Sequence, residues 1–245
     1  MIKESTEQTY GNGRLEFFGS YCEARRLMDY TYFKNYTQER QLFQDTIISK
    51  YFLNKDILDK KQCKPWIIFM CGCYGAGKTH TLKHLNTKNI LPTDNFVYID
   101  PDKIKDVLPE TKSLIEECPN DVGRLLHKEA TFIALLIEYI ALTSNYYIIV
   151  DGSLYNHEWY AEHFNEIKEK YHYKIGIIYV NASLENMLTR CHKRNIETGR
   201  IISDDMIIFI HKKISVAVDV LDKYADMFLT IDNNGSISIK SIRFN

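Results

Sequence analysis

The sequence contains little glycine and proline and carries almost no net charge. Only 11 of the 245 residues are glycine and 5 are proline, which excludes long linkers rich in these residues. Lys and Arg total 31 and Asp and Glu total 32, so the formal net charge of −1 gives no indication of a nucleic-acid or membrane binder. No apolar run approaches the roughly 18 residues that a membrane-spanning helix needs.

The six cysteines are scattered along the chain and form no metal-binding pattern. They are Cys22, Cys63, Cys71, Cys73, Cys118 and Cys191. Two of them, Cys71 and Cys73, are too close together for the usual spacing of zinc ligands. The first residues, MIKESTEQTYGNG, lack the apolar stretch of a signal peptide. These features favour reduced thiols and a cytoplasmic protein.

The first 62 residues have a helical pattern and are rich in aromatic and charged side chains. Apolar residues recur at helical spacings, namely Leu42, Phe43, Ile47, Phe52 and Leu53. We predict an N-terminal extension, residues 1–62, of one to three helices that pack on a second region, residues 63–245. The extension shows no catalytic pattern, and a partner-binding arm is the alternative interpretation.

From Pro65 onward, short apolar segments alternate with helical patterns. The candidate strands are residues 66–71, 95–100, 146–153, 174–182 and 227–232. Two of the helical patterns cover residues 121–144 and 203–224. Such alternation is typical of a parallel sheet covered by helices on both faces. We therefore predict an α/β fold with a five-stranded, mainly parallel sheet.

The segment GCYGAGKT, residues 72–79, fits the pattern G-x-x-x-x-G-K-[ST] of a phosphate-binding loop. It follows an apolar strand pattern and precedes a helical one, which is the context that the motif requires. We expect Gly75 and Gly77 to let the backbone turn its N–H groups toward a phosphate, most simply that of ATP. Lys78 should reach the β- and γ-phosphates, and the Thr79 hydroxyl should bind Mg²⁺. The residues expected to contact the nucleotide are Gly72, Cys73, Tyr74, Gly75, Ala76, Gly77, Lys78, Thr79 and His80.

Carboxylates follow the second and third candidate strands. Because ligands gather at the carboxyl ends of parallel strands, we expect Asp100, Asp102 and Asp151 near the loop. Asp102 is the predicted base that takes a proton from an acceptor hydroxyl. Asp100 would orient this segment, or contact the acceptor or the metal shell. Asp151 would bind Mg²⁺ or position the acceptor, and helix capping is the alternative for the first two.

The absence of two sequence motifs helps to distinguish nucleotide hydrolysis from phosphoryl transfer. No Asp-Glu pair follows the third candidate strand, where many motor ATPases use such a pair to activate water. No Asn-Lys-x-Asp motif for guanine follows the loop. These absences favour transfer of a phosphoryl group to a bound acceptor over hydrolysis of a nucleotide.

The segment LTRCHKRNIETGRI contains three arginines that are candidates for stabilising a transferring phosphoryl group. Arg190 and Arg194 are four residues apart and therefore share a helix face. Thr198 and Gly199 would end this helix and place Arg200 on a mobile lid. A solvated basic helix end is the alternative interpretation.

Glu129 lies in RLLHKEATF, where polar residues interrupt a long apolar helical pattern. Its position is compatible with two arrangements. The side chain would either face a cleft and bind an acceptor hydroxyl, or belong to a solvated stripe of the helix.

Five segments together resemble the zeta-toxin-like P-loop kinases over about residues 65–232. They are GCYGAGKT, YIDPDKIK, HKEATFIA, IIVDGSLYNHEWY and TRCHKRNIETGRII. The resemblance implies an ATP- and Mg²⁺-dependent kinase that phosphorylates a sugar hydroxyl of UDP-N-acetylglucosamine, although more distant relatives use other nucleotide-type acceptors. It also implies roles for individual residues. Asp102 is the base, Glu129 binds the substrate, Asp151 is the acidic residue that ends the third strand, and Arg200 is the later lid arginine. The earlier lid arginine is Arg190 or Arg194.

Two other functions share parts of this pattern. A polynucleotide or nucleoside kinase would use the same loop and aspartates, although the near-neutral charge counts against long nucleic acid as substrate. An ATP-dependent binding switch would use its N-terminal helices to engage a protein partner.

Overall fold

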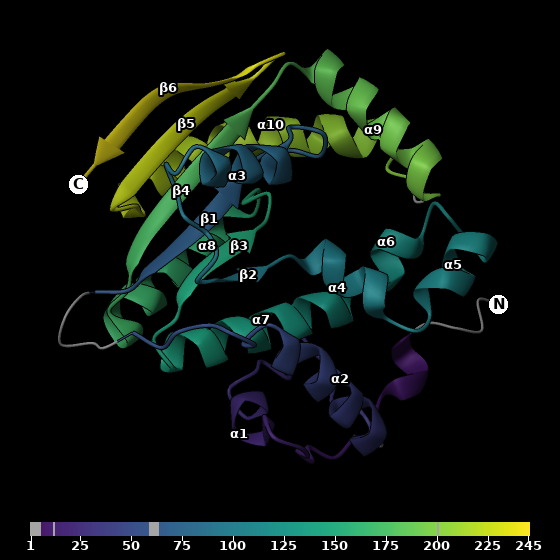
Figure 1. Cartoon of the computed structure of the whole chain (residues 1–245). Helices are drawn as coiled ribbons and strands as arrows, with labels where there is room; N and C mark the ends of the chain where they lie inside the picture. The colour runs from purple at the N-terminus through teal and green to yellow at the C-terminus, as the bar shows by residue number, and fades with distance from the viewer. Residues whose placement is uncertain (1–5, 12, 59–63, 200) are drawn as a thin grey trace.

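The computed structural model describes residues 6–11, 13–58, 64–199 and 201–245. In this part of the chain, helices surround a six-stranded sheet (Figure 1). The strands are β1 (Trp66–Cys71), β2 (Phe96–Ile99), β3 (Tyr147–Asp151), β4 (Lys174–Asn181), β5 (Met227–Asn233) and β6 (Ile237–Phe244). The α-helices are α1 (Cys22–Arg25), α2 (Gln38–Lys50), α3 (Lys78–Thr87), α4 (Pro101–Val107), α5 (Thr111–Glu117), α6 (Val122–Leu125), α7 (His127–Thr143), α8 (His157–Glu166), α9 (Leu184–Thr198) and α10 (Asp204–Leu221). Shorter helical turns are η1 (Thr6–Thr9), η2 (Ile167–Tyr171) and η3 (Asp222–Tyr224).

The strand order is β2-β3-β1-β4-β5-β6, and the first five strands are parallel. The α/β fold and the five predicted strands are therefore confirmed. The sixth strand, β6, was not predicted. It pairs antiparallel with β5 through a register shift between Thr230 and Ile231, and most of its residues are exposed.

The two predicted helical patterns differ in detail from the helices that form. The pattern over residues 121–144 is divided at Leu126 into the short α6 and the long α7. The pattern over residues 203–224 forms α10 and the short turn η3, and the Ser203 hydroxyl caps α10 by accepting a hydrogen bond from the Met206 N–H. None of the helices in the described segments has the length and apolar character needed to cross a bilayer.

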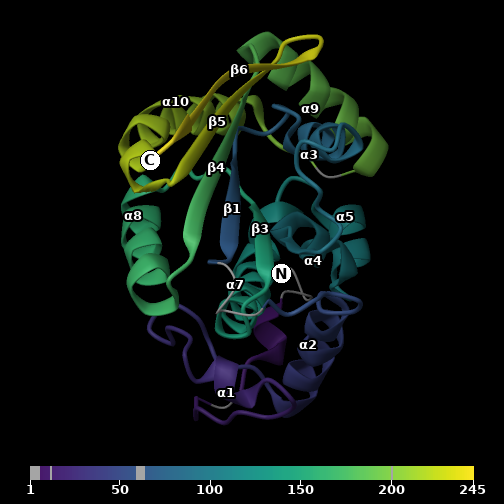
Figure 2. The same ribbon diagram turned by 60° about the vertical axis from the view of Figure 1, so that its left-hand side comes forward.

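The two faces of the sheet pack against different helices. Phe69 of β1 contacts Phe164 of α8, with ring centroids 4.7 Å apart, and α7 contacts β2 and β3. Figure 2 shows α8 and α10 on one side of the strands and α3 on the other. Because strand residues alternate between faces, Ile68 points away from α8 and toward the face that carries α3.

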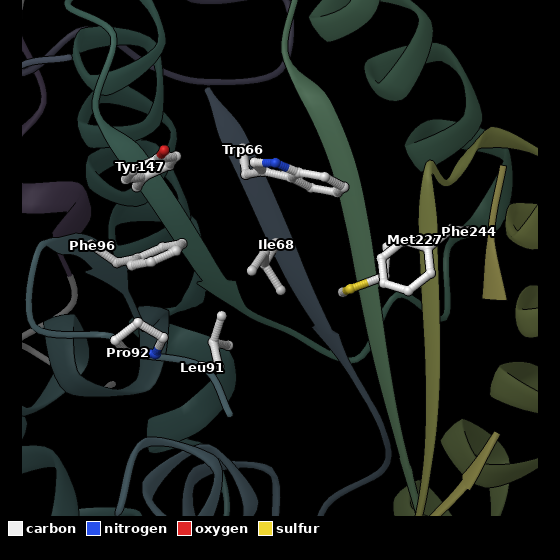
Figure 3. A pocket seen from close by; sticks show the side chains of 8 residues that line it. All are labelled: Trp66, Ile68, Leu91, Pro92, Phe96, Tyr147, Met227 and Phe244. Atoms are coloured by element: carbon white, nitrogen blue, oxygen red, sulfur yellow. The ribbon is translucent and has the colours of Figure 1, made fainter. Parts of the chain in front are cut away.

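An apolar cavity of about 320 Å³ lies at the amino ends of the parallel strands (Figure 3). Its lining residues are Trp66, Ile68, Leu91, Pro92, Phe96, Tyr147, Met227 and Phe244. Most of these residues are at or near the first residue of a parallel strand. The cavity is therefore at the opposite end of the sheet from the predicted phosphate loop.

The N-terminal segment packs on α7 through aromatic residues and forms α1 and α2, within the predicted range of one to three helices. Phe33 and Tyr36 contact Phe132 of α7, with ring centroids 5.3 and 5.2 Å apart. The Thr37 hydroxyl caps α2 by accepting a hydrogen bond from the backbone N–H of Arg40. The predicted boundary between residues 62 and 63 lies outside the described residues.

Candidate active site

The predicted phosphate loop connects the end of β1 to the start of α3. Gly75 and Gly77 have φ angles of 73° and 90°, which residues with a side chain rarely adopt, and Gly77 is the N-cap of α3. The first N–H groups of a helix have no partner within the helix, and they attract phosphate oxygens. The backbone therefore has the conformation that a phosphate-binding loop requires.

Lys78, Thr79 and Asp151 come together beside this loop. Lys78 Nζ donates to the Gly72 carbonyl at 3.1 Å and lies 3.9 Å from Asp151 Oδ1. The Thr79 hydroxyl donates to Asp151 Oδ2 at 3.3 Å, and the Tyr98 hydroxyl donates to the same oxygen at 2.7 Å. The ends of β1, β2 and β3 thus bring a cation, a carboxylate and two hydroxyl groups into one cluster.

The donor set at this cluster suits Mg²⁺ bound together with a nucleotide. Mg²⁺ prefers oxygen ligands and in such sites is held by one or two protein oxygens plus phosphates and water. The Thr79 hydroxyl and the Asp151 carboxylate are oxygens of this kind. Across the described ranges, no group of three or more His, Cys, Asp or Glu side chains could hold a metal ion. A metal held here would depend on ligands from the nucleotide.

Asp100 caps the N-terminus of α4, as the alternative interpretation of this residue predicted. Its Oδ1 accepts hydrogen bonds from the backbone N–H groups of Asp102, at 2.9 Å, and Lys103, at 3.4 Å. Burial, followed by the nearby carboxylates of Asp151 and Asp102, raises the pKa of Asp100. The site therefore concentrates negative charge that a bound cation would offset.

Asp102 lies in the first turn of α4, where its carboxylate is paired with a lysine. Lys105 Nζ donates to Asp102 Oδ1 at 3.1 Å, and the Lys105 side chain is almost completely buried. Burial, followed by the charge of Asp102, raises the pKa of Tyr74 to about 12. Because Tyr74 belongs to the phosphate loop, the Asp102 carboxylate is near enough to this loop to influence it electrostatically.

The three candidate arginines have different surroundings. Arg190 of α9 donates from Nη1 to the Gly75 carbonyl at 3.2 Å, so its guanidinium group lies against the back of the loop. Arg194, one turn further along α9, is exposed. The helix ends as predicted, with Gly199 at its C-cap and a φ of 71°. Arg200 lies outside the described residues, so its lid role stays a prediction.

The remaining loop residues differ in what they offer a ligand. The side chain of Cys73 is buried and its Sγ donates to the Ile207 carbonyl at 3.3 Å. Burial raises the pKa of the Cys73 thiol to about 11, so this cysteine stays protonated near neutral pH. Ala76 is also buried, whereas His80 is exposed in the first turn of α3. Cys73 and Ala76 can therefore contact a nucleotide only through their backbone.

Glu129 is completely buried in α7 and is bound by the N-terminal segment. Its carboxylate accepts hydrogen bonds from Arg40 Nε at 2.7 Å and Gln44 Nε2 at 2.9 Å. Neither of the two surroundings considered for Glu129, an open cleft or a solvated stripe, describes this position. Substrate binding by Glu129 stays a prediction, and in this structure the carboxylate already has protein partners.

Three residues of the site were not predicted. Tyr98 lies on β2 two positions before Asp100, and Asn233 ends β5, so the rule about the carboxyl ends of strands could have found both. Arg40 gave no local signal, because its partner Glu129 is 89 positions away.

The parallel sheet, the loop between β1 and α3 and the acidic residues at the neighbouring strand ends define a P-loop kinase-like protein. The family model for the zeta toxin matches residues 52–242, and the chain belongs to this family. The family and the fold support an ATP-dependent kinase or phosphotransferase. No curated protein sequence matches the chain.

Several solved structures share the fold at low sequence identity. A structure of the PezAT chromosomal toxin-antitoxin system of Streptococcus pneumoniae matches with a TM-score of 0.70 and 16% identity, covering 85% of this chain and 83% of that one. A chain of AvrRxo1-ORF1:-ORF2 with ATP matches with a TM-score of 0.67 and 18% identity, covering 98% of this chain and 76% of that one. The second match therefore includes most of the residues before position 52, where the family model begins.

Proposed function

We propose that this protein transfers the γ-phosphoryl group of ATP to a hydroxyl group of a small acceptor, best represented by a nucleotide sugar such as UDP-N-acetylglucosamine. The observation that carries the proposal is the cluster of Lys78, Thr79 and Asp151 beside a loop with the phosphate-binding conformation. We assign Asp102, in the first turn of α4, as the base that completes the site. The choice of a nucleotide sugar as the acceptor rests on the resemblance to the zeta-toxin family.

The proposed reaction is an in-line transfer in which each side chain has one task. The acceptor oxygen forms a bond to the γ-phosphorus while the bond from that phosphorus to the β–γ bridging oxygen breaks, and ADP leaves with the electron pair. Asp102 takes the proton of the acceptor hydroxyl, and Lys105 holds the Asp102 carboxylate in place. Lys78 balances charge on the phosphates. Mg²⁺ held by Thr79 and Asp151 would supply further positive charge.

The same proposal assigns tasks beyond the loop. Arg194 and Arg200 would contact the transferring group, and Asp100 would order the segment that carries the base. Residues 1–62 would form an extension that stabilises the kinase region, residues 63–245, and offers a surface for a protein partner. The two similar structures belong to a toxin-antitoxin system and to AvrRxo1-ORF1:-ORF2, which supports testing for such a partner. A cytoplasmic location stays a prediction.

The test is an acceptor screen with the purified protein. Mass spectrometry would follow ATP, Mg²⁺ and a mixture of UDP-sugars, nucleosides and a 5′-hydroxyl oligonucleotide for any product that gains one phosphate. We expect a phosphorylated UDP-sugar from the wild type and none from Lys78→Ala. Asp102→Asn should lower turnover by at least about 100-fold, the usual contribution of a general base, while circular dichroism should show that the variant remains folded.

Each alternative gives a different result in the screen. A phosphorylated oligonucleotide or nucleoside would identify the other class of kinase. Tight ATP binding without acceptor-dependent ADP release, together with partner capture that requires residues 1–62, would indicate a binding switch. Undiminished turnover by Asp102→Asn would refute the assignment of the base.

A further inference from the structure

The carbonyl groups at the back of the phosphate loop are bound by residues from outside the loop. A loop that turns its N–H groups toward a phosphate turns carbonyl oxygens away from it, and buried carbonyls need donors. Ala76 is fully buried, and its carbonyl oxygen accepts a hydrogen bond from Asn233 Nδ2 at 2.8 Å. Asn233 is the last residue of β5 and is only 5% exposed.

Arg190 makes a second connection at the same place. Its Nη1 donates to the carbonyls of Gly75, at 3.2 Å, and Ala76, at 3.5 Å. Its Nη2 donates to the backbone carbonyl of Asn233 at 2.8 Å. One guanidinium group therefore joins the loop to the end of β5, and both loop carbonyls have donors.

The glycines of the motif face this connection. A Cβ atom at Gly75 would collide with the backbone carbonyl of Met187 in α9, and one at Gly77 would collide with the side-chain amide of Asn233. Such close approach leaves the loop little freedom to rotate its peptide groups. The spacing of the glycines is thus linked to packing behind the loop as well as to the turn itself.

We propose that Asn233 and Arg190 form a phosphate-loop clamp, a pair of positioning residues that fixes the direction of the loop N–H groups. The inference rests on the proposed function, because it requires the loop to bind the phosphates of a nucleotide. In this assignment Arg190 acts through the loop backbone, and the lid role is left to Arg194 and Arg200.

If the clamp positions the loop, its loss should lower the affinity of the protein for a particular set of ligands. The backbone of such a loop holds the α- and β-phosphates, which ADP and ATP share. Loss of a clamp residue should therefore weaken the binding of ATP and ADP to the same extent, and should also weaken the binding of inorganic tripolyphosphate. If Asn233 and Arg190 instead contacted the γ-phosphate directly, their loss would lower the affinity for ATP and tripolyphosphate but not for ADP. If they contacted the nucleobase, their loss would lower the affinity for ATP and ADP only.

The experiment measures dissociation constants of ATP, ADP and inorganic tripolyphosphate by calorimetry, with Mg²⁺ present. Asn233→Ala removes a donor to a buried carbonyl, so we expect about tenfold weaker binding of all three ligands. Asn233→Asp keeps the shape but places an acceptor against the Ala76 carbonyl, and it should weaken all three further. The matched control is Asn35→Ala, which removes a buried amide that donates to the carbonyls of Arg14 and Glu16 in the N-terminal segment. The control should leave the three dissociation constants unchanged.

A kinetic measurement separates positioning from general destabilisation. Once an acceptor is known, Asn233→Ala should raise the KM for ATP about tenfold while leaving kcat nearly unchanged, because the lost binding is common to the ground and transition states. Melting temperatures of Asn233→Ala and Asn35→Ala should fall by similar amounts, since both lose a comparable buried amide. If Asn233→Ala does not fold, Asn233→Asp and Arg190→Gln supply the same comparison.

Three results would overturn the clamp. They are unchanged affinity in the Asn233 variants, loss confined to ATP and tripolyphosphate, and loss confined to the two nucleotides. A wild-type protein that binds none of the ligands would refute the proposed function together with the clamp. A wild type that binds all three while the variants bind equally well would refute only the clamp.

Discussion

Arg40 and Glu129 are 89 positions apart in the sequence and form a buried ion pair with two hydrogen bonds. Arg40 Nε lies 2.7 Å from Glu129 Oε1, and Arg40 Nη2 lies 2.9 Å from Glu129 Oε2. Arg40 Nη2 also donates to Glu110 Oε2 at 2.8 Å. Burial alone would lower the pKa of Arg40, but these two carboxylates outweigh burial and raise it. The guanidinium group thus connects α2 to α7 and to the residue that precedes α5.

The first prediction concerns the stability that depends on this ion pair. Arg40→Met would leave the buried Glu129 carboxylate without its counter-ion, and we expect a loss of about 3–5 kcal/mol in unfolding free energy. The double variant Arg40→Met, Glu129→Gln should recover part of that loss, because the fully buried residue 129 then carries no unpaired charge. Urea unfolding followed by circular dichroism would measure both.

The control for this prediction is an exposed pair in the same segment. Arg26 and Glu23 form an ion pair with side chains 56% and 81% exposed, so Arg26→Met should change stability by less than about 1 kcal/mol. Equal losses in Arg40→Met and Arg26→Met would contradict the importance of the buried pair.

The second prediction concerns Tyr98, whose hydroxyl holds Asp151. Tyr98→Phe removes the 2.7 Å hydrogen bond to Asp151 Oδ2 while leaving the ring in place. Partners that orient a metal ligand commonly change metal affinity by 10- to 100-fold, so half-maximal turnover should require about tenfold more Mg²⁺. A Mg²⁺ titration of the kinase reaction at saturating ATP would measure the shift. An identical Mg²⁺ dependence in the variant would show that Tyr98 does not influence a metal site.

The third prediction uses the carboxylates that surround Asp100. Because its pKa is raised, mainly by burial and then by Asp151 and Asp102, the folded protein holds this proton more tightly than the unfolded chain. The stabilisation that protonated Asp100 contributes is therefore lost as the pH rises from the pKa of Asp100 in the unfolded chain through its pKa in the folded protein. Asn is also a good N-cap, so Asp100→Asn should keep the cap without the charge.

Thermal unfolding without Mg²⁺ tests this expectation. The melting temperature of Asp100→Asn should exceed that of the wild type at about pH 8, and the difference should be smaller at about pH 4. A difference that grows toward low pH would have the wrong sign. Added Mg²⁺ should stabilise the wild type more than the variant.

The fourth prediction concerns the buried pair of His163 and Glu138. The His163 Nε2 atom and Glu138 Oε1 are hydrogen-bonded in the interior. Burial by itself lowers the pKa of His163, but the charge and hydrogen bond of Glu138 outweigh it, so the pKa is raised. The resulting stabilisation is fully present below the unfolded-state value of about 6.5 and is lost as pH rises through the folded value.

Glu138→Gln should remove most of this pH dependence while keeping a polar partner for the imidazole. The melting temperature of the wild type should exceed that of Glu138→Gln most clearly below about pH 6, and the two curves should converge as pH increases. Parallel curves across that range would exclude His163 as the titrating group.

The parts of the fold that follow from local patterns were predictable. Each of the first five strands is a short apolar segment, and residues 72–79 carry their turn chemistry in the glycines and the lysine. The strand β6 was missed because ISIKSIRF is largely exposed, so burial imposes no strong pattern on it. Its place is set by pairing with β5, which a pattern within one segment does not reveal.

Some features of the candidate site were likewise predictable from local patterns, and others were not. Sequence spacing placed Arg190 and Arg194 on one helix, but it could not tell that Arg190 turns to loop carbonyls while Arg194 is exposed. The burial of Glu129 depends on Arg40, and no property of either local segment identifies the other as its partner. Contacts between distant segments are set by the packing of the whole chain, so patterns within single segments do not reveal these features.

The stacking of Trp159 on His163 gives the protein an internal optical reporter. The chain has two tryptophans, and Trp66 lines the apolar cavity at the amino ends of the strands. The rings of Trp159 and His163 are stacked with centroids 4.6 Å apart, so a change of charge on the imidazole acts directly on the indole. A change in the protonation of His163 should therefore alter the emission of Trp159, which can be recorded against pH without any label.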